Sequence, residues 1–187
     1  MALNSSGPIS LAGTTAGQSI EIENGGNGTT QISLNDAAVR TLAGVASGAI
    51  TMPTNFYGKS NRATISYTIG ANVANTSVNL SSLVGYSAGK TDFTVTVNSG
   101  IYVYATSTGG YALSLTGGTT GDTLTIVNNG YIMGQGGAGG KGNGVQNLAG
   151  NAGGPAINFG FGMSGATINN TNASAYIGGG GGGGAGT

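Results

Sequence analysis

Few side chains in this sequence are suited to acid–base or metal chemistry. The chain has no histidine and no cysteine, which excludes imidazole and thiolate metal sites, cysteine nucleophiles and histidine-based triads. Its carboxylates are Glu21, Glu23, Asp36, Asp92 and Asp122. A two-carboxylate glycosidase stays formally open, but no acid is flanked by the aromatic or hydrogen-bonding residues that such a site needs. We therefore expect no enzyme activity, no catalytic residue, no cofactor and no metal site.

Two glycine–lysine stretches invite comparison with phosphate-binding loops. Gly85-Tyr86-Ser87-Ala88-Gly89-Lys90-Thr91 is one residue short of the required spacing, and the residues after it form a strand pattern instead of a helix pattern. Gly140-Lys141-Gly142 lacks the hydroxyl residue and the upstream glycine. Neither stretch predicts a nucleotide site.

The composition narrows the class of protein further. Of 187 residues, 40 are glycine and only 5% are charged, with a formal net charge of zero. Nucleic-acid binding depends on basic residues that neutralise phosphates, so it is not expected. The start of the chain lacks a signal-peptide pattern, and no apolar run approaches the roughly 18 residues of a membrane span.

The chain divides by composition into three zones, residues 1–60, 61–133 and 134–187. The first zone contains one helix pattern over residues 33–44. Ser33 with Asp36 has the spacing of a capping box, and Gly44 is a natural residue to follow the helix. Such a short helix is not stable alone, so it must pack on its own domain or on a partner chain.

Residues 61–133 alternate polar and apolar side chains, as β-strands do. The clearest runs are Thr64–Ile69, Phe93–Val97, Tyr111–Leu115 and Thr123–Val127. Asn129-Gly130 after the last run is the favoured pair for a two-residue hairpin turn. Several short strands at this spacing predict either a small sandwich or a solenoid.

Residues 134–187 are dominated by glycine and have two interpretations. A flexible linker is one. The other is a set of left-handed three-residue helices like polyglycine II, which have no internal hydrogen bonds and must bond to one another. Strand-like insertions and a repeat support the second: Thr125–Gly134 and Thr167–Gly178 each run through strand and turn residues into a glycine tract. The predicted fold is therefore mainly β, with one short N-terminal helix and a C-terminal region of glycine helices and hairpins.

Several motifs of this chain resemble those of phage virion proteins. The segments Leu34–Arg40, Leu42–Val45, Ser47–Ile50 and Asn55–Lys59, with the opening Ser5–Leu11, resemble the N-terminal module of phage virion structural proteins. The Asn-Asn-Gly-Tyr-Ile-x-Gly motif and the glycine tracts resemble phage tail-fibre and tail-tip proteins. They are also similar to the glycine-rich tip adhesins of T-even-type phages.

The resemblance implies a structural protein of the virion tail, tail tip or baseplate. Residues 1–60 would attach to other virion proteins, and the remainder would face a host receptor, either a polysaccharide or an outer-membrane protein. Loops between glycine tracts bind the receptor in such adhesins. The matching residues, with one tyrosine at a tract entrance, are Lys141, Asn143, Gln146, Asn147, Phe159, Phe161 and Tyr176.

Two other functions stay open at this point. The same N-terminal module, strands and glycine tracts suit a capsid or neck decoration protein that binds no receptor. They also suit a glycine-rich surface- or ice-binding protein from outside any virus. A homo-oligomer, such as a trimer, is natural for a fibre, and a single copy is equally compatible with the sequence.

Overall fold

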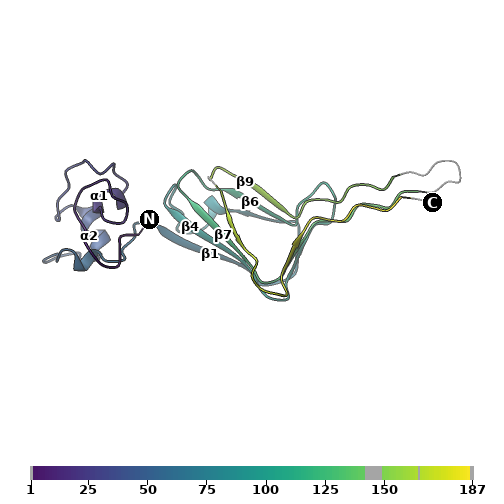
Figure 1. Ribbon diagram of the computed structural model, residues 1–187, viewed down its shortest axis with the longest axis horizontal. Helices are drawn as coiled ribbons and strands as arrows, with labels where there is room; N and C mark the ends of the chain where they lie inside the picture. The colour runs from purple at the N-terminus through teal and green to yellow at the C-terminus, as the bar shows by residue number, and fades with distance from the viewer. Residues whose placement is uncertain (1, 142–148, 164, 186–187) are drawn as a thin grey trace. The chain divides into compact units, whose positions relative to one another are not determined.

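The computed structural model describes residues 2–141, 149–163 and 165–185. The chain forms two compact units, Met1–Arg62 and Ala63–Thr187 (Figure 1). The second unit contains both the strand zone and the glycine zone. The described residues contain eleven short strands, all in this unit, and these make the protein mainly β, as the sequence predicts.

The first unit is built from short helical turns around a small apolar core. Its elements are α1 (Ile20–Glu23), α2 (Ala37–Ala43) and the 3-10 helix η1 (Thr54–Phe56). Ile20 and Phe56 are completely buried, and Val39 and Leu42 of α2 pack with them. Because α2 has only seven residues, its stability comes from this packing and not from the isolated helix.

The helix is shorter than predicted and begins at Ala37 instead of Ser33. Ser33 lies in a preceding turn, where its N–H donates to the Asp36 carboxylate at 2.7 Å and its hydroxyl accepts from Asn35 N at 3.1 Å. Asp36 is the N-cap residue. Gly44 ends the helix with φ of 72°, a conformation that glycine adopts without a steric penalty.

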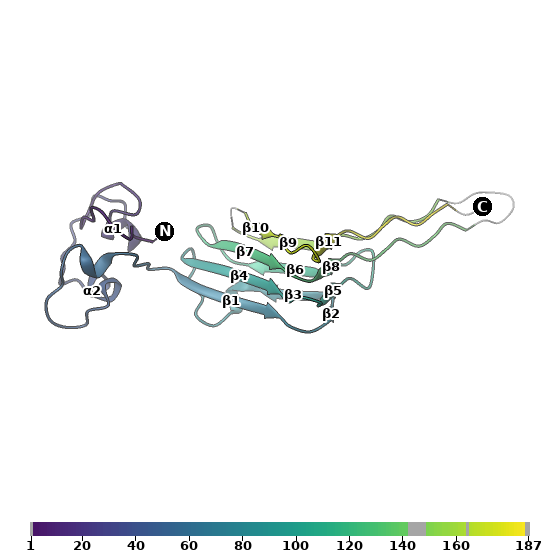
Figure 2. The same ribbon diagram turned by 60° about the horizontal axis from the view of Figure 1, so that its bottom comes forward.

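The second unit is a three-sided parallel β-solenoid (Figure 2). Successive strands enter three sheets in turn, so each pass of the chain stacks on the one before. The sheet orders are β1-β4-β7-β10, β11-β8-β5-β2 and β3-β6-β9. The strand bounds are β1 Ala63–Ile69, β2 Val73–Ala74, β3 Thr76–Asn79, β4 Thr91–Val97, β5 Tyr102–Tyr104, β6 Leu113–Gly117, β7 Thr123–Asn128, β8 Tyr131–Met133, β9 Ile157–Phe161, β10 Thr167–Asn169 and β11 Tyr176–Gly178, with the 3-10 helix η2 at Leu80–Ser82.

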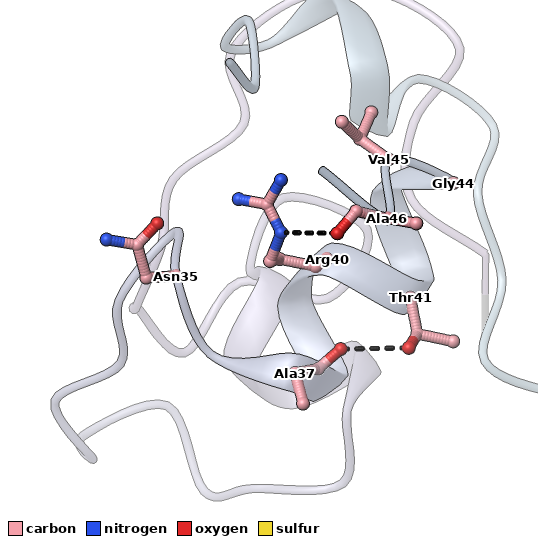
Figure 3. A pocket seen from close by; sticks show the side chains of 7 residues that line it. All are labelled: Asn35, Ala37, Arg40, Thr41, Gly44, Val45 and Ala46. Carbon is pink, nitrogen blue, oxygen red and sulfur yellow. Dashed lines mark hydrogen bonds between the residues drawn. The ribbon is translucent and has the colours of Figure 1, made fainter. Parts of the chain in front are cut away.

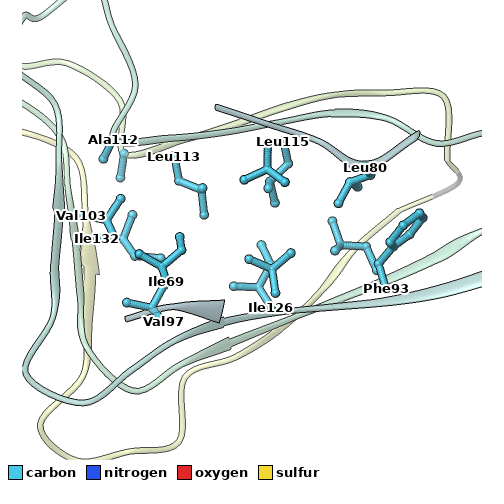
Figure 4. Packing of buried hydrophobic residues seen from close by; sticks show 14 of the residues in the cluster. Ile69, Leu80, Phe93, Val97, Val103, Ala112, Leu113, Leu115, Ile126 and Ile132 are labelled. Atoms are coloured by element: carbon cyan, nitrogen blue, oxygen red, sulfur yellow. The ribbon is translucent and has the colours of Figure 1, made fainter. Parts of the chain in front are cut away.

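Alternating residues of each strand fill the interior of the solenoid. In β4 every second residue is buried, and the register places Tyr67, Val95 and Ile126 in one inward column across three strands. Figure 4 shows such side chains converging from facing sheets, with Leu113 and Leu115 opposite Val97 and Ile126. The stacked passes therefore share one continuous apolar core.

The predicted hairpin at Asn129-Gly130 is wrong. β7 and β8 belong to different sheets, so this turn is a corner of the solenoid. A type I′ hairpin turn requires a positive φ at its glycine, and Gly130 is not among the positive-φ glycines. Glycine is needed there for another reason: a Cβ would overlap the carbonyl oxygens of Asn98 and Ile101 in the pass below.

Beyond β8 and β11 the glycine tracts extend as three segments lying side by side (Figures 1 and 2). We call residues 134–141, 149–154 and 178–185 the first, second and third segments of the glycine arm. The first and third run in the same direction and the second runs opposite, as the partners of their hydrogen bonds show. The backbone bonds between segments, written as N–H donor and carbonyl acceptor, are Gly134–Gly178, Gly137–Gly181, Gly140–Gly184, Asn151–Ala138, Gly154–Gln135, Gly180–Gly154 and Gly183–Asn151.

These bonds recur every three residues in each segment and measure 2.7–2.9 Å. That spacing is the period of a left-handed helix with three residues per turn, as predicted for the glycine zone. Donation runs in a closed cycle: the first segment donates to the third, the third to the second and the second to the first. Each segment is thus held by both of the others.

Glycine is required at every third position of the arm. A Cβ at Gly137 would overlap the carbonyl oxygen of Asn151, and one at Gly180 would overlap that of Gln135. By contrast, a Cβ at Gly181 would meet nothing within 4 Å. The non-glycine residues Gln135 and Ala138 lie between the required positions, so side chains are kept out of the interior of the arm.

This contrast yields a matched pair of variants. Gly180→Ala forces the third segment away from the first and is expected to destabilise the arm by about 1–3 kcal/mol, the usual cost of overpacking. Gly181→Ala, one residue along, is expected to change stability by less than about 1 kcal/mol. Amide hydrogen exchange of the third segment, followed by mass spectrometry, measures both. Equal exchange rates in the two variants would contradict the packing described.

Candidate functional site

Those predicted receptor-binding residues that the structure describes lie on different elements. Lys141 is exposed at the end of the first arm segment, the last described residue before the next gap. Asn143, Gln146 and Asn147 lie outside the described residues.

Phe159 and Phe161 belong to β9, and Tyr176 belongs to β11 in a different sheet. Phe159 is 42% exposed although it pairs in register with buried Leu115. Its strand is the last of its sheet, so no further strand covers it. Of Phe161 only the backbone is described, paired with Gly117.

Tyr176 lies on an aromatic face that the sequence alone did not assemble. The register of the sheet β11-β8-β5-β2 aligns Tyr176 with Tyr131 and Tyr131 with Tyr102. The rings of Tyr102 and Tyr131 stack with centroids 4.6 Å apart and planes 15° from parallel. Tyr104, two residues from Tyr102, points to the same side of its strand. We call Tyr102, Tyr104, Tyr131 and Tyr176 the tyrosine face. The sequence does contain a signal for this face, since a tyrosine stands at the first position of three short strands, at Tyr102, Tyr131 and Tyr176.

All five carboxylates accept hydrogen bonds that hold the fold together. Asp122 is buried and accepts from Thr91 N at 2.9 Å, Thr119 N at 2.8 Å and the Tyr86 hydroxyl at 3.0 Å. The bonds of the other four join Glu21 to the N–H groups of Asn27 and Gly28, Glu23 to Ser60 and Asn61, Asp36 to Ser33 N, and Asp92 to the Thr123 hydroxyl. They are therefore structural, and they are spread over both units.

The first unit has an open hollow of about 460 Å³ beside α2 (Figure 3). Arg40 and Thr41 line it, with Asn35, Gly44 and neighbouring backbone. The Arg40 guanidinium donates to the carbonyl oxygens of Ala46 at 3.3 Å and Gly48 at 2.8 Å. The arginine thus fixes the loop after the helix, and the hollow keeps a defined shape.

Two further features are absent from the part of the chain that the structure describes. No group of three or more acidic side chains there is placed to bind a metal ion. None of the helices described is both long enough and apolar enough to cross a bilayer.

Comparison with known protein families identifies a match over most of the second unit. The family model described as "Phage tail fibre adhesin Gp38" matches residues 64–187, which is more than half of the chain. The match covers the solenoid and the glycine arm, and it leaves out all of the first unit. No curated protein and no solved structure matches the chain.

The structural role of the carboxylates can be tested at Asp122. Asp122→Asn replaces one acceptor oxygen by an NH₂ group that faces other donors, so we expect a loss of about 2–3 kcal/mol in the free energy of unfolding. Asp92→Asn, on the outer side of β4, is the matched control and should cost clearly less. Urea unfolding followed by circular dichroism compares the two. An Asp122→Asn protein as stable as wild type would refute the assignment.

Proposed function

Since this chain belongs to the phage tail fibre adhesin Gp38 family, we propose that it recognises the host through segments displayed at the end of its glycine arm. Family membership makes it a phage adhesin of the virion tail, and it implies contacts with a host receptor and with other tail components. A position at the tail tip is part of the proposal. The family match favours this function over a capsid or neck protein and over a non-viral surface-binding protein.

The proposed mechanism is display on a stiff backbone scaffold. The arm's segments are joined by hydrogen bonds every three residues, and the first of them ends at Lys141. Residues 142–148 follow the first segment and precede the second in the sequence, and the proposal assigns receptor contacts to Asn143, Gln146 and Asn147 among them. A scaffold of this kind needs no large apolar core, and it tolerates substitutions in the residues that it carries.

Amide and lysine side chains suit a polar receptor such as a polysaccharide or an exposed loop of an outer-membrane protein. Each contact of this type is weak. Several copies on one particle would convert weak contacts into firm attachment through effective concentration. A trimer and a single copy on another fibre are both consistent with this mechanism.

Residues 1–60 are proposed to attach the protein to the rest of the tail. Support comes from the unit's separate core and from the defined hollow beside α2, a concave surface that could accept a segment of a partner. The family match begins at residue 64, so residues 1–60 lie outside the matched part, which supports a separate role for them.

We propose no catalytic activity. The hydrogen bonds that all five carboxylates accept from the surrounding fold, spread over both units, support this part of the proposal. Release of reducing sugar from host polysaccharide by the purified protein would overturn it.

Competition with the parent phage tests the display mechanism. Purified chain in excess should slow adsorption to host cells, and the triple variant Asn143→Ala, Gln146→Ala, Asn147→Ala should need about tenfold more protein for the same effect. Gly180→Ala should also weaken competition, since it disturbs the scaffold, whereas Gly181→Ala should compete as wild type does.

Two results would count against the mechanism. If the triple variant competes as well as wild type, the contact residues lie elsewhere. If wild type itself does not compete at any concentration, this chain does not carry the receptor contacts.

A further inference from the structure

The tyrosine face has an unusual combination of exposure and order. Tyr102 and Tyr104 are each 41% exposed and Tyr176 is 52% exposed. Contiguous exposed apolar surface on a soluble protein usually marks an interaction site. The face belongs to the strands β5, β8 and β11, and two of these, β8 and β11, lead directly into the glycine arm (Figure 2).

Tyr176 lies flat against its own strand. A Cβ at Gly178 would overlap the hydroxyl and ring carbons of Tyr176, so the ring covers the glycine two residues ahead. One side of the ring therefore rests on the backbone, and the high exposure of the side chain leaves the other side to solvent. The result is a flat aromatic platform held at the edge of a rigid sheet.

The chemistry around the platform is polar but uncharged. The phenol hydroxyls of Tyr102, Tyr104, Tyr131 and Tyr176 make no hydrogen bond within the described residues, so they are available to a ligand. The strands β2, β5, β8 and β11 contain no Asp, Glu, Lys or Arg. A charged ligand would find no counter-charge on these strands.

A flat aromatic ring with free hydroxyls beside it and no charge is complementary to a neutral sugar. The C–H face of a pyranose packs on an aromatic ring, and its hydroxyls bond to phenols. Because Tyr102 and Tyr131 are already stacked and Tyr176 already lies flat, little side-chain entropy is lost on binding. We propose that the tyrosine face binds neutral hexose units of a glycan, with Tyr176 as the stacking platform.

This inference rests on the proposed adhesin function and adds a ligand class and a second contact surface at the base of the arm. It differs from the contacts proposed at the arm's end in both residues and chemistry. The two can therefore fail independently: loss of sugar binding leaves the competition by arm-end residues intact, and the reverse also holds.

The test measures binding of neutral oligosaccharides of glucose, galactose, mannose and N-acetylglucosamine to the full chain. Saturation-transfer NMR detects binding, and intrinsic tyrosine fluorescence gives the affinity, which is practical because the chain has no tryptophan. Tyr176→Ala should weaken binding about three- to tenfold, the range of one aromatic contact. Tyr176→Phe keeps the aromatic ring and should retain most of the sugar affinity.

Two further variants distinguish sugar binding at the tyrosine face from a general effect of removing a tyrosine or disturbing the fold. Gly178→Ala keeps every tyrosine but pushes the Tyr176 ring off the strand, so it should weaken binding as Tyr176→Ala does. Tyr111→Ala removes an equally exposed tyrosine (39%) that lies outside the face, and it should bind as wild type does. Circular dichroism confirms that each variant is folded.

Three outcomes would overturn the proposal. One is that wild type binds none of these sugars at millimolar concentration. Another is that sugar binding survives both Tyr176→Ala and Gly178→Ala in folded protein. The third is that the tyrosines prove necessary only for binding a protein, shown by a partner whose capture is lost after protease treatment, or for self-association in sedimentation experiments.

Discussion

Main-chain hydrogen bonds between segments far apart in the sequence hold residues 63–185 together. In the solenoid they join parallel strands of successive passes, and in the arm they join glycine segments every three residues. Both arrangements need the backbones to approach closely, which explains glycine at the solenoid corner Gly130 and at Gly137 and Gly180 in the arm. The second unit is thus one stack of main chain, held by packed side chains in the solenoid and by backbone hydrogen bonds in the arm.

The two parts resist unfolding in different ways. The solenoid buries aliphatic columns such as Val95 with Ile126, so the hydrophobic effect stabilises it. The arm has almost no apolar side chains and relies on satisfied backbone donors and acceptors, while glycine adds a large ordering cost. The closed cycle of backbone hydrogen bonds among the three segments offsets this loss of conformational entropy.

Sequence patterns predicted the β-strands well because polar–apolar alternation is local. The runs Phe93–Val97 and Thr123–Val127 fall within β4 and β7. Sandwich and solenoid were indistinguishable, since alternation does not reveal whether neighbouring strands are parallel. The prediction at Asn129-Gly130 failed for a related reason. Glycine is required there because of close contact with the backbone of the pass below, and not because of the conformation of its own turn. The tyrosine face depends on register between passes of unequal length, and no local pattern contains that information.

Residue-resolved hydrogen exchange of the arm amides by NMR tests the central claim most directly. If the segments are bonded as described, protection should follow the three-residue period, with Gly137, Gly180 and Gly183 exchanging much more slowly than Gly136, Gly181 and Gly182. The slow amides are those that donate across the arm. Uniform exchange of all six at the rate of an unstructured peptide would contradict the account, because the arm would then be a tether and not a scaffold.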